Sequence, residues 1–273
     1  MGSFILEPDQ EPQALEQHFP ILFALTELLT CLSCDPITWR LIPVRDLMSM
    51  VNRNYSAFAA EEAKASLANL LELVGNPDGY SQEMHKLGSL LGTLLNEKIC
   101  DTQRCLVAAT AEDADFLGRG IYDSLKQEHL TKAAVFWNNH YTIPGGGSIA
   151  PVVHRFMEPG YESSDVLIIA KSVISGSCVV RTNILELIEV IKPQKIYIVS
   201  LVMHSDSEES LRKEFPLSIS EKFEFLVFAT DSVRIDGEVK PGIGGEVYPL
   251  LGLEDQPARM GFMPKLVQEL AVL

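Results

Sequence analysis

Apolar residues recur at helical spacing through the first hundred residues, and this pattern predicts a mainly helical N-terminal part. Serine at a helix start and glycine after a helix end are the usual boundary signals. The predicted helices are Leu15–Leu32, a helix capped by Ser56 that stops at Gly75, and a helix that begins near Ser81 after the turn 76–79. We therefore predict a flexible tail over residues 1–14 and a helical region over residues 15–100.

The third predicted helix contains two glycines, Gly88 and Gly92, four residues apart. Residues four apart lie on one helix face, and glycine there leaves room for a second backbone. The spacing favours helix packing.

After Asp101 short apolar runs alternate with helical patterns. Continuously apolar strands are typical of a parallel sheet that is covered on both faces. The predicted strands are 105–109, 133–137, 165–170, 195–202 and 223–228, and the predicted helices are 111–128, 177–191, a short one capped by Ser205 or Asp206, and 264–273. We predict one α/β domain over residues 101–273.

Composition narrows the functional classes. The chain has 273 residues, is 47% hydrophobic, and carries a net charge of −15. This acidic balance argues against binding to nucleic acid or to an anionic membrane, both of which need clustered Lys and Arg. No apolar stretch is long enough to span a bilayer, and the N-terminus lacks the pattern of a secretory signal. Five scattered cysteines fit a reducing compartment, so we expect a cytoplasmic protein.

A candidate anion site follows the apolar strand that starts at Asp165. Ser175, Gly176 and Ser177 form a turn of small residues before a helix, and free amides at a helix start favour a phosphate. An ordinary strand-to-helix turn with a capping serine explains the same pattern. Lys171 is either a phosphate contact or a solvated lysine.

A second candidate segment runs from Asp231 through a hairpin to a glycine-rich loop at Gly242, Ile243 and Gly244. Taken alone, this segment fits an ordinary glycine-rich turn near a strand end.

In this order the two segments resemble the phosphate loop and the base loop of uracil phosphoribosyltransferases. Val166–Ile169 matches the family's strand, Ser175–Ser177 is similar to its Thr-Gly-Gly turn, and Lys240–Gly245 is similar to its Val-Pro-Gly-Leu-Gly-Asp loop. The resemblance implies a phosphoribosyltransferase-type sheet and a homodimer. It implies that Lys171, Ser175, Gly176 and Ser177 bind a phosphate and that Gly242, Ile243 and Gly244 bind the base.

Three departures from the family pattern concern charge. Ala170 stands at the family's acidic position, and neither 106–110 nor 137–140 carries the arginine expected there. Alanine cannot accept the hydrogen bonds of ribose hydroxyls, and arginine is the usual bidentate phosphate ligand. We therefore expect a protein that has lost transferase activity and binds a nucleotide, a phosphorylated sugar or a protein partner. The alternative is a divergent transferase acting on an unidentified base, for which Mg²⁺ is the expected cofactor.

Three further groups have both a chemical and a structural interpretation. Cys31, Cys34, Cys100 and Cys105 could bind zinc but fit buried thiols better. His140 and His154 flank a glycine-rich loop and could meet at the mouth of a site. Acidic residues at 112–115 fit helix capping, with a cation or basic-partner contact as the alternative.

Overall fold

The computed structural model describes residues 53–142, 147–253 and 261–271. The predicted tail, the first predicted helix, Cys31 and Cys34 lie outside the described residues. Across the described ranges, none of the helices has both the length and the apolar character that crossing a bilayer requires.

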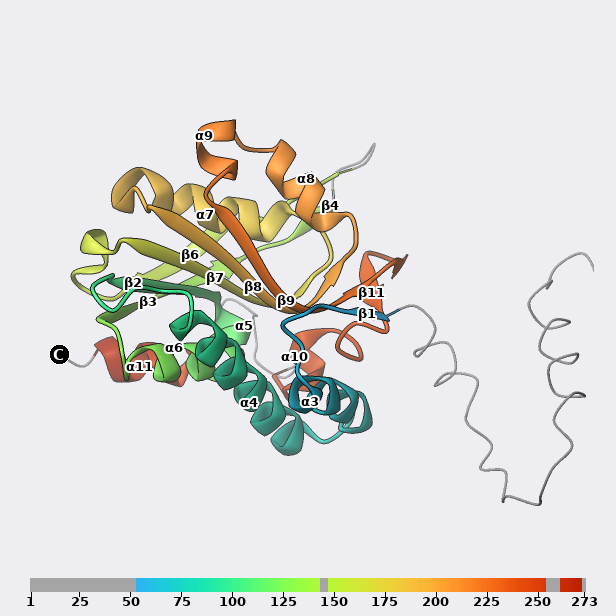
Figure 1. Cartoon of the computed structure of the whole chain (residues 1–273). Helices are drawn as coiled ribbons and strands as arrows, with labels where there is room; N and C mark the ends of the chain where they lie inside the picture. The colour runs from blue at the N-terminus through green and yellow to red at the C-terminus, as the bar shows by residue number, and fades with distance from the viewer. Residues whose placement is uncertain (1–52, 143–146, 254–260, 272–273) are drawn as a thin grey trace, which may run out of the picture. The chain divides into compact units, whose positions relative to one another are not determined.

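A seven-stranded sheet organises the described residues (Figure 1). The five central strands pair in parallel, and the two outer strands, β1 and β6, pair antiparallel to their neighbours. In spatial order the strands are β1 (Arg53–Tyr55), β9 (Phe223–Asp231), β8 (Lys195–His204), β7 (Val166–Ile174), β2 (Cys105–Thr110), β3 (Thr131–Asn138) and β6 (Val152–Met157). The predicted α/β class with a mostly parallel sheet is confirmed.

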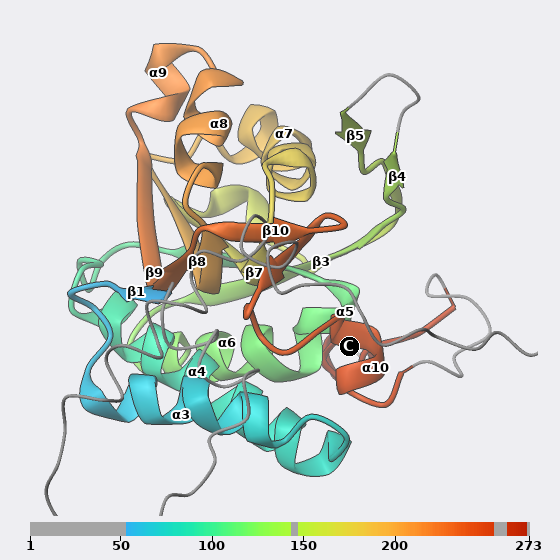
Figure 2. The ribbon, with the colours of Figure 1, turned by 90° about the vertical axis from the view of Figure 1, so that its right-hand side faces the viewer.

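Helices cover both faces of the sheet (Figures 1 and 2). Successive strand residues point to opposite faces, so Val107 and Ala109 of β2 pack into one core and Leu106 and Ala108 into the other. The first core contains α3 (Glu61–Glu72), α4 (Pro77–Asn96), η2 (Ala114–Gly118) and α6 (Arg119–Leu125). The second contains α7 (Cys178–Ile191) and α8 (Ser207–Lys213), and α11 (Lys265–Ala271) packs on β3 in a third cluster.

Several predicted boundaries in the N-terminal part were wrong. Ser56 does not cap a helix, because residues 53–55 form an edge strand and α3 starts only at Glu61. The segment predicted as a turn, 76–79, instead starts α4: Asn76 Oδ1 accepts the Gly79 N–H at 3.2 Å, and proline occupies the first helical position. Proline at that position loses no intrahelical hydrogen bond, so it signals a helix start as well as a turn.

The remaining corrections concern strands and short elements. Strand β7 continues to Ile174 rather than ending at Ala170, and the helix predicted over 111–128 is divided into α5 (Ala111–Asp113), η2 and α6. Sequence reasoning also missed β6 and the small pair β4 (Tyr141–Thr142) and β5 (Ser148–Ile149). The remaining short elements are η3 (Tyr161–Ser163), α9 (Leu217–Ser220), β10 (Val233–Ile235), β11 (Glu238–Lys240) and α10 (Val247–Leu250).

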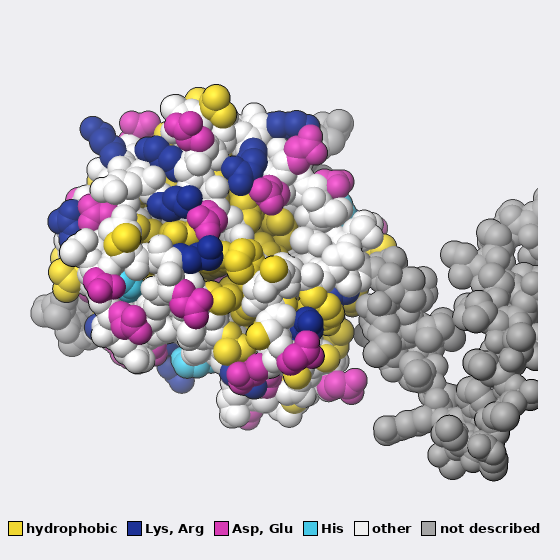
Figure 3. Space-filling model, viewed as in Figure 1, with side chains coloured by type: hydrophobic (Ala, Val, Ile, Leu, Met, Phe, Trp, Pro, Cys, Tyr) yellow, Lys and Arg dark blue, Asp and Glu magenta, His cyan; other side chains and the backbone are white. Residues whose placement is uncertain are grey.

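The open edge of β9 carries paired charges. β1 covers only Ala229–Asp231 of this strand. In the part of β9 that β1 does not cover, Glu224 forms ion pairs with Lys98 and Lys195, and the Arg212 guanidinium lies over the Phe225 ring, 5.0 Å from its centroid. Figure 3 shows charged side chains of both signs around an apolar area on this face. Charges on an edge strand oppose pairing with another sheet.

Gly88 and Gly92 allow α4 to pack closely on η2 and α6. A Cβ atom at Gly88 would lie 2.3 Å from the Leu117 carbonyl oxygen, and one at Gly92 would lie 2.5 Å from Ser124 Cβ. The predicted helix-packing role of both glycines is confirmed.

We expect Gly88→Ala to lower the free energy of unfolding by about 1–3 kcal/mol, the usual cost of overpacking. The higher helix propensity of alanine, about 1 kcal/mol, offsets only part of a backbone clash. Urea unfolding followed by circular dichroism measures the loss. Thr93→Ala, on the exposed face of the same helix, is the control and should change stability by less than about 0.5 kcal/mol. An equal effect of both substitutions would contradict the packing role.

Candidate functional site

A cavity of about 440 Å³ lies where β7 ends and α7 begins. This is the carboxyl end of a central parallel strand, where α/β sheets usually bind ligands. The lining residues are Glu112; His140 and Ser148; Lys171, Val173, Ile174, Ser175, Gly176, Cys178, Val179 and Val180; and Asp236, Gly237, Glu238, Val239, Ile243, Gly245, Glu246, Val247 and Tyr248.

The cavity brings together the two segments singled out in the sequence. Lys171, Ser175 and Gly176 line one side and Ile243 lines another, although the two segments are about seventy residues apart in the chain. The hairpin β10–β11 follows β9 directly, and the second loop runs from β11 to α10 beside the carboxyl ends of the strands (Figure 2). Of the predicted site residues, all of which are described, Ser177, Gly242 and Gly244 do not line the cavity.

Lys171 is held by two carboxylates. Its Nζ lies 2.7 Å from Asp113 Oδ2 and 3.2 Å from Glu112 Oε1, and its side chain is only 12% exposed. Burial by itself lowers the pKa of Lys171, but the charges of Asp113 and Glu112 outweigh it and raise that pKa above its ordinary value. The lysine is therefore a fixed cation and not the solvated lysine that the sequence left open.

Asp113 reaches Lys171 because β2 and β7 are parallel neighbours whose carboxyl ends meet. The Asp113 side chain is fully buried, and its Oδ2 also accepts the Thr110 hydroxyl at 3.0 Å and the Ser172 N–H at 3.2 Å. Its Oδ1 is buried without a hydrogen-bond partner. The resemblance places a carboxylate at position 170, but Ala170 stands there and is buried in the apolar core. The carboxylates near Lys171 are those of Glu112 and Asp113, which directly follow β2.

The remaining acidic residue of the 112–115 cluster serves another helix. Asp115 accepts the backbone N–H groups of Lys265 and Leu266 at 2.9 and 2.8 Å, which caps the start of α11. The expectation that acids of this cluster stand at a helix start is confirmed, because Glu112 and Asp113 lie in the first turn of α5, although they make no side-chain capping bond there.

The first turn of α7 presents backbone amides to the cavity. Its residues Cys178, Val179 and Val180 line the cavity, and first-turn N–H groups have no acceptor within their own helix. Ser177 occupies the N-cap position but makes no capping bond. Its hydroxyl donates instead to Glu214 Oε1 at 2.6 Å. Glu214 also lies 3.5 Å from Arg181 Nε, so an internal carboxylate stands beside the predicted phosphate turn.

The glycine-rich loop is fixed by a buried ion pair. Arg53 donates from Nε and Nη2 to the two oxygens of Asp231 at 3.0 and 2.8 Å, and the two side chains are 4% and 0% exposed. Arg53 Nη2 also donates to the Gly242 carbonyl, and Asp231 Oδ2 accepts the Gly242 N–H at 2.9 Å. Both backbone groups of Gly242 are therefore used inside the protein.

Ile243 is anchored from α4. The Tyr80 hydroxyl, fully buried, donates to the Ile243 carbonyl at 2.7 Å. Burial, with a smaller contribution from the charge of Asp113, raises the pKa of Tyr80 above its ordinary range, so the hydroxyl stays a donor. The loop also bonds to itself, since Gly244 N–H donates to the Pro241 carbonyl at 3.1 Å.

Two loop positions require glycine. Gly242 has a φ of 57°, and a Cβ there would lie 2.4 Å from the Val239 carbonyl oxygen. Gly244 has a φ of 99°, and a Cβ there would lie 2.8 Å from the Val74 side chain. Both lie in the left-handed region that favours glycine.

Other candidates from the sequence lie elsewhere. His140 lines the cavity, whereas His154 packs edge-on against Trp137 with ring centroids 6.4 Å apart. Arg119 pairs with Asp123 and Glu269, and Arg155 pairs with Glu186. Within the described residues the cavity has no arginine in its lining, and no three His, Cys, Asp or Glu side chains gather as a metal site. Cys100 is exposed and Cys105 is buried.

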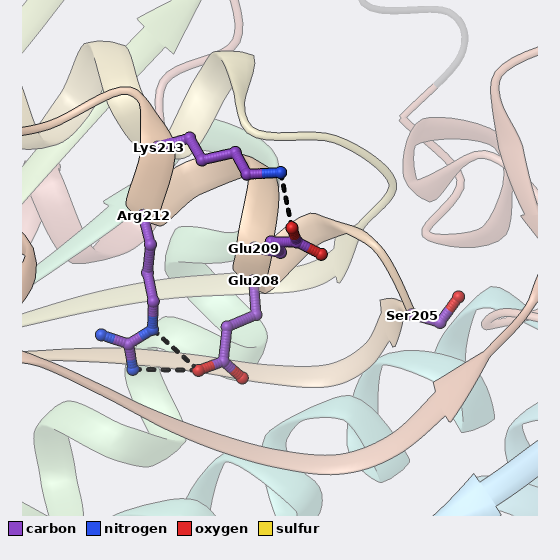
Figure 4. A pocket seen from close by; sticks show the side chains of 5 residues that line it. All are labelled: Ser205, Glu208, Glu209, Arg212 and Lys213. Carbon is purple, nitrogen blue, oxygen red and sulfur yellow. Dashed lines mark hydrogen bonds and ion pairs between the residues drawn. The ribbon is translucent and has the colours of Figure 1, made fainter.

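A second hollow lies on α8 (Figure 4). Its charged side chains pair along one helix, Arg212 with Glu208 at 2.9 Å and Lys213 with Glu209 at 2.5 Å. These are exposed pairs at helical spacing, and they bring no groups from separate elements together. The cavity at Lys171 is therefore the better candidate for a functional site.

Sequence comparison finds no family model and no curated protein that matches the chain. Structure comparison does find matches. The AQ2163 protein from Aquifex aeolicus superposes with a TM-score of 0.57 at 12% identity, over 72% of this chain and 96% of that one. This likeness concerns the fold alone.

Two phosphoribosyltransferases also match, with lower scores. The hypoxanthine phosphoribosyltransferase from Staphylococcus aureus matches at 11% identity with a TM-score of 0.34, over 45% of this chain and 65% of that one. The adenine phosphoribosyltransferase from Thermoanaerobacter pseudethanolicus matches at 11% identity with a TM-score of 0.34, over 52% of this chain and 80% of that one.

Proposed function

We propose that this chain is a phosphoribosyltransferase-like binding protein that has lost transfer chemistry. Its ligand is a nucleotide or a phosphorylated sugar, bound in the cavity beside Lys171. The phosphate lies against the amides of Ser175, Gly176 and the first turn of α7, and a ring or sugar lies toward Ile243. The proposal rests on the resemblance of the two loops and on the cavity that they share.

The ion pairs of Lys171 with Glu112 and Asp113 support the proposal that this chain has lost transferase activity. Phosphoribosyl transfer depends on charged groups that stabilise developing charge and hold a pyrophosphate. Here Ala170 replaces the family's carboxylate, and Glu112, which lines the cavity, and the buried Asp113 are bound to Lys171 at 3.2 and 2.7 Å. Arg119 and Arg155, which could have supplied phosphate contacts, are paired with acidic residues outside the cavity.

Thermal unfolding tests ligand binding. We expect uridine monophosphate or ribose 5-phosphate to raise the melting midpoint, because a ligand at a hundred times its Kd stabilises the folded state by about 2.7 kcal/mol. Ser175→Asp should abolish the shift by placing a carboxylate at the phosphate turn. Ser163→Asp, on the exposed η3, is the matched control and should keep the shift. No shift with any phosphate-bearing compound in the unmodified protein would overturn the proposal.

A divergent transferase is the second candidate, because both loops still meet at a cavity that could hold two substrates. Release of pyrophosphate from phosphoribosyl pyrophosphate with uracil, adenine, hypoxanthine or guanine distinguishes the two functions. Base-dependent release would favour the transferase, and binding without release would favour the proposed role.

Glu214 should weaken phosphate binding in the unmodified protein. Its carboxylate holds the Ser177 hydroxyl and adds a negative charge beside the turn. We expect Glu214→Gln to tighten ribose 5-phosphate binding about fivefold, which corresponds to about 1 kcal/mol for removing one partly exposed charge. Calorimetric titration measures this change.

The control for Glu214 is Glu209→Gln, on the same side of the sheet but paired with Lys213 in solvent. That substitution should leave the affinity within about twofold, since exposed ion pairs contribute little. Equal affinity for both variants would remove Glu214 from the site.

The homodimer, a protein partner and a cytoplasmic location remain predictions from sequence. Light scattering tests the first of them, and a homodimer should give twice the 30.2 kDa mass of one chain.

A further inference from the structure

Magnesium is the cation that a phosphoribosyltransferase resemblance implies. Mg²⁺ takes oxygen ligands in near-octahedral geometry and is usually held by one or two protein carboxylates together with water and the phosphates of a ligand. Glu112, which lines the cavity, and the buried Asp113 both bind the Lys171 ammonium. The other lining carboxylates come from the β10–β11 hairpin and the loop after it: Asp236, Glu246, and Glu238, which pairs with Lys240. In the described part of the chain, no three metal-ligating side chains come together. The residues present do not fit a magnesium ion.

The Lys171 ammonium occupies the place between these carboxylates. It is 12% exposed and lines the cavity, and the charges of Asp113 and Glu112 outweigh burial, raise its pKa and keep it protonated. An ammonium has three N–H donors, and two of them point to Asp113 Oδ2 and Glu112 Oε1. The third donor remains for an oxygen of a ligand in the cavity. A divalent cation brought to this position would be repelled by the lysine.

We propose that Lys171 is the resident cation of the cavity and that the site binds its anionic ligand without a divalent metal. The inference rests on the proposed binding function for the identity of the ligand. It does not depend on it for the exclusion of metal, which is argued from the pairing of Lys171 with Glu112 and Asp113 and from the separation of the other metal-ligating side chains in the described residues. Glu112 and Asp113 orient the ammonium toward the cavity, much as outer-shell carboxylates orient the ligands of a metal ion.

Manganese, which has a usable electron paramagnetic resonance signal and takes the same hard ligands, tests metal exclusion without any organic ligand. The unmodified protein and Glu112→Gln should bind Mn²⁺ with affinities within about fivefold, because Glu112 is already used by Lys171 and its substitution changes only one nearby charge. Lys171→Met removes one positive charge and releases two carboxylates, so it should bind Mn²⁺ at least about tenfold more tightly. Lys213→Met, which breaks an exposed pair with Glu209 on α8 away from the cavity, is the matched control and should show no such gain.

Mn²⁺ binding by the unmodified protein at least about tenfold tighter than by Glu112→Gln would show that Glu112 is a metal ligand and would overturn the inference. That comparison does not need Lys171→Met to fold. Ribose 5-phosphate is the second probe, titrated into the unmodified protein with excess Mg²⁺ and with a chelator. Its Kd should agree within about twofold in the two buffers, and a gain of about tenfold or more with Mg²⁺ would also overturn the inference.

The two proposals fail in different ways. If ribose 5-phosphate does not bind in either buffer, the proposed function is contradicted. The Mn²⁺ comparison between the unmodified protein and Glu112→Gln then still decides whether Lys171 is the resident cation.

Discussion

Arg53→Ala is expected to lower the free energy of unfolding by about 3–5 kcal/mol, the usual cost of breaking a buried ion pair. The substitution leaves Asp231 fully buried without its counter-ion and removes a donor from the Gly242 carbonyl. A buried charge without a partner is far more costly than an exposed one. Chemical denaturation followed by fluorescence and circular dichroism measures the loss.

Arg104→Ala is the matched control, because Arg104 holds Asp165 with the same two-pronged geometry. Its Nε and Nη2 atoms lie 2.9 and 3.0 Å from the carboxylate oxygens, but the Arg104 side chain is 45% exposed. Hydrogen bonds from Arg104 lower the pKa of Asp165. Since the pair stands in solvent, its loss should cost only about 0–1 kcal/mol. Similar losses for both arginines would show that burial does not set the strength of the Arg53 pair.

The Arg53 variant should also weaken ligand binding. The loop at Gly242 takes its shape from Arg53 and Asp231, and its neighbour Ile243 lines the cavity. We expect loss of the thermal shift with ribose 5-phosphate at temperatures where the variant is still folded. The Arg104 variant should keep that shift.

Lys171→Met is the second substitution with a large expected effect, again about 3–5 kcal/mol. Methionine fills a similar volume, so the loss comes from the buried Asp113 carboxylate and not from a cavity. One oxygen of that carboxylate already lacks a hydrogen-bond partner, which leaves Thr110 and Ser172 as its remaining donors. The midpoint of urea unfolding reports the change.

A second substitution separates charge from packing at this position. Asp113→Asn combined with Lys171→Met removes both charges and keeps an oxygen acceptor, so it should recover part of the lost stability. Lys240→Met, which breaks an exposed pair, should cost less than about 1 kcal/mol. A Lys171→Met variant as stable as the Lys240→Met variant would contradict the buried ion pair.

The alternation of apolar strands with helical segments was enough to predict the α/β sheet, because the central strands are buried on both faces over most of their length and are therefore mainly apolar. Helix α7 was predicted within one residue of its observed start, since the small residues at 175–177 end the strand and begin the turn. The edge strands β1 and β6 were missed because they are exposed, partly polar and paired only through tertiary contacts.

The sequence also determined which two loops could meet, since both follow the carboxyl ends of strands in one sheet. It could not determine how the charges pair. Lys171 meets Asp113 across 58 residues of chain, Tyr80 meets Ile243 across 163, and Arg53 meets Asp231 across 178. No local pattern specifies such pairs, because an ion pair depends on which strand ends become neighbours. Only the tertiary structure therefore showed that the lysine of the predicted phosphate site is already bound to two carboxylates.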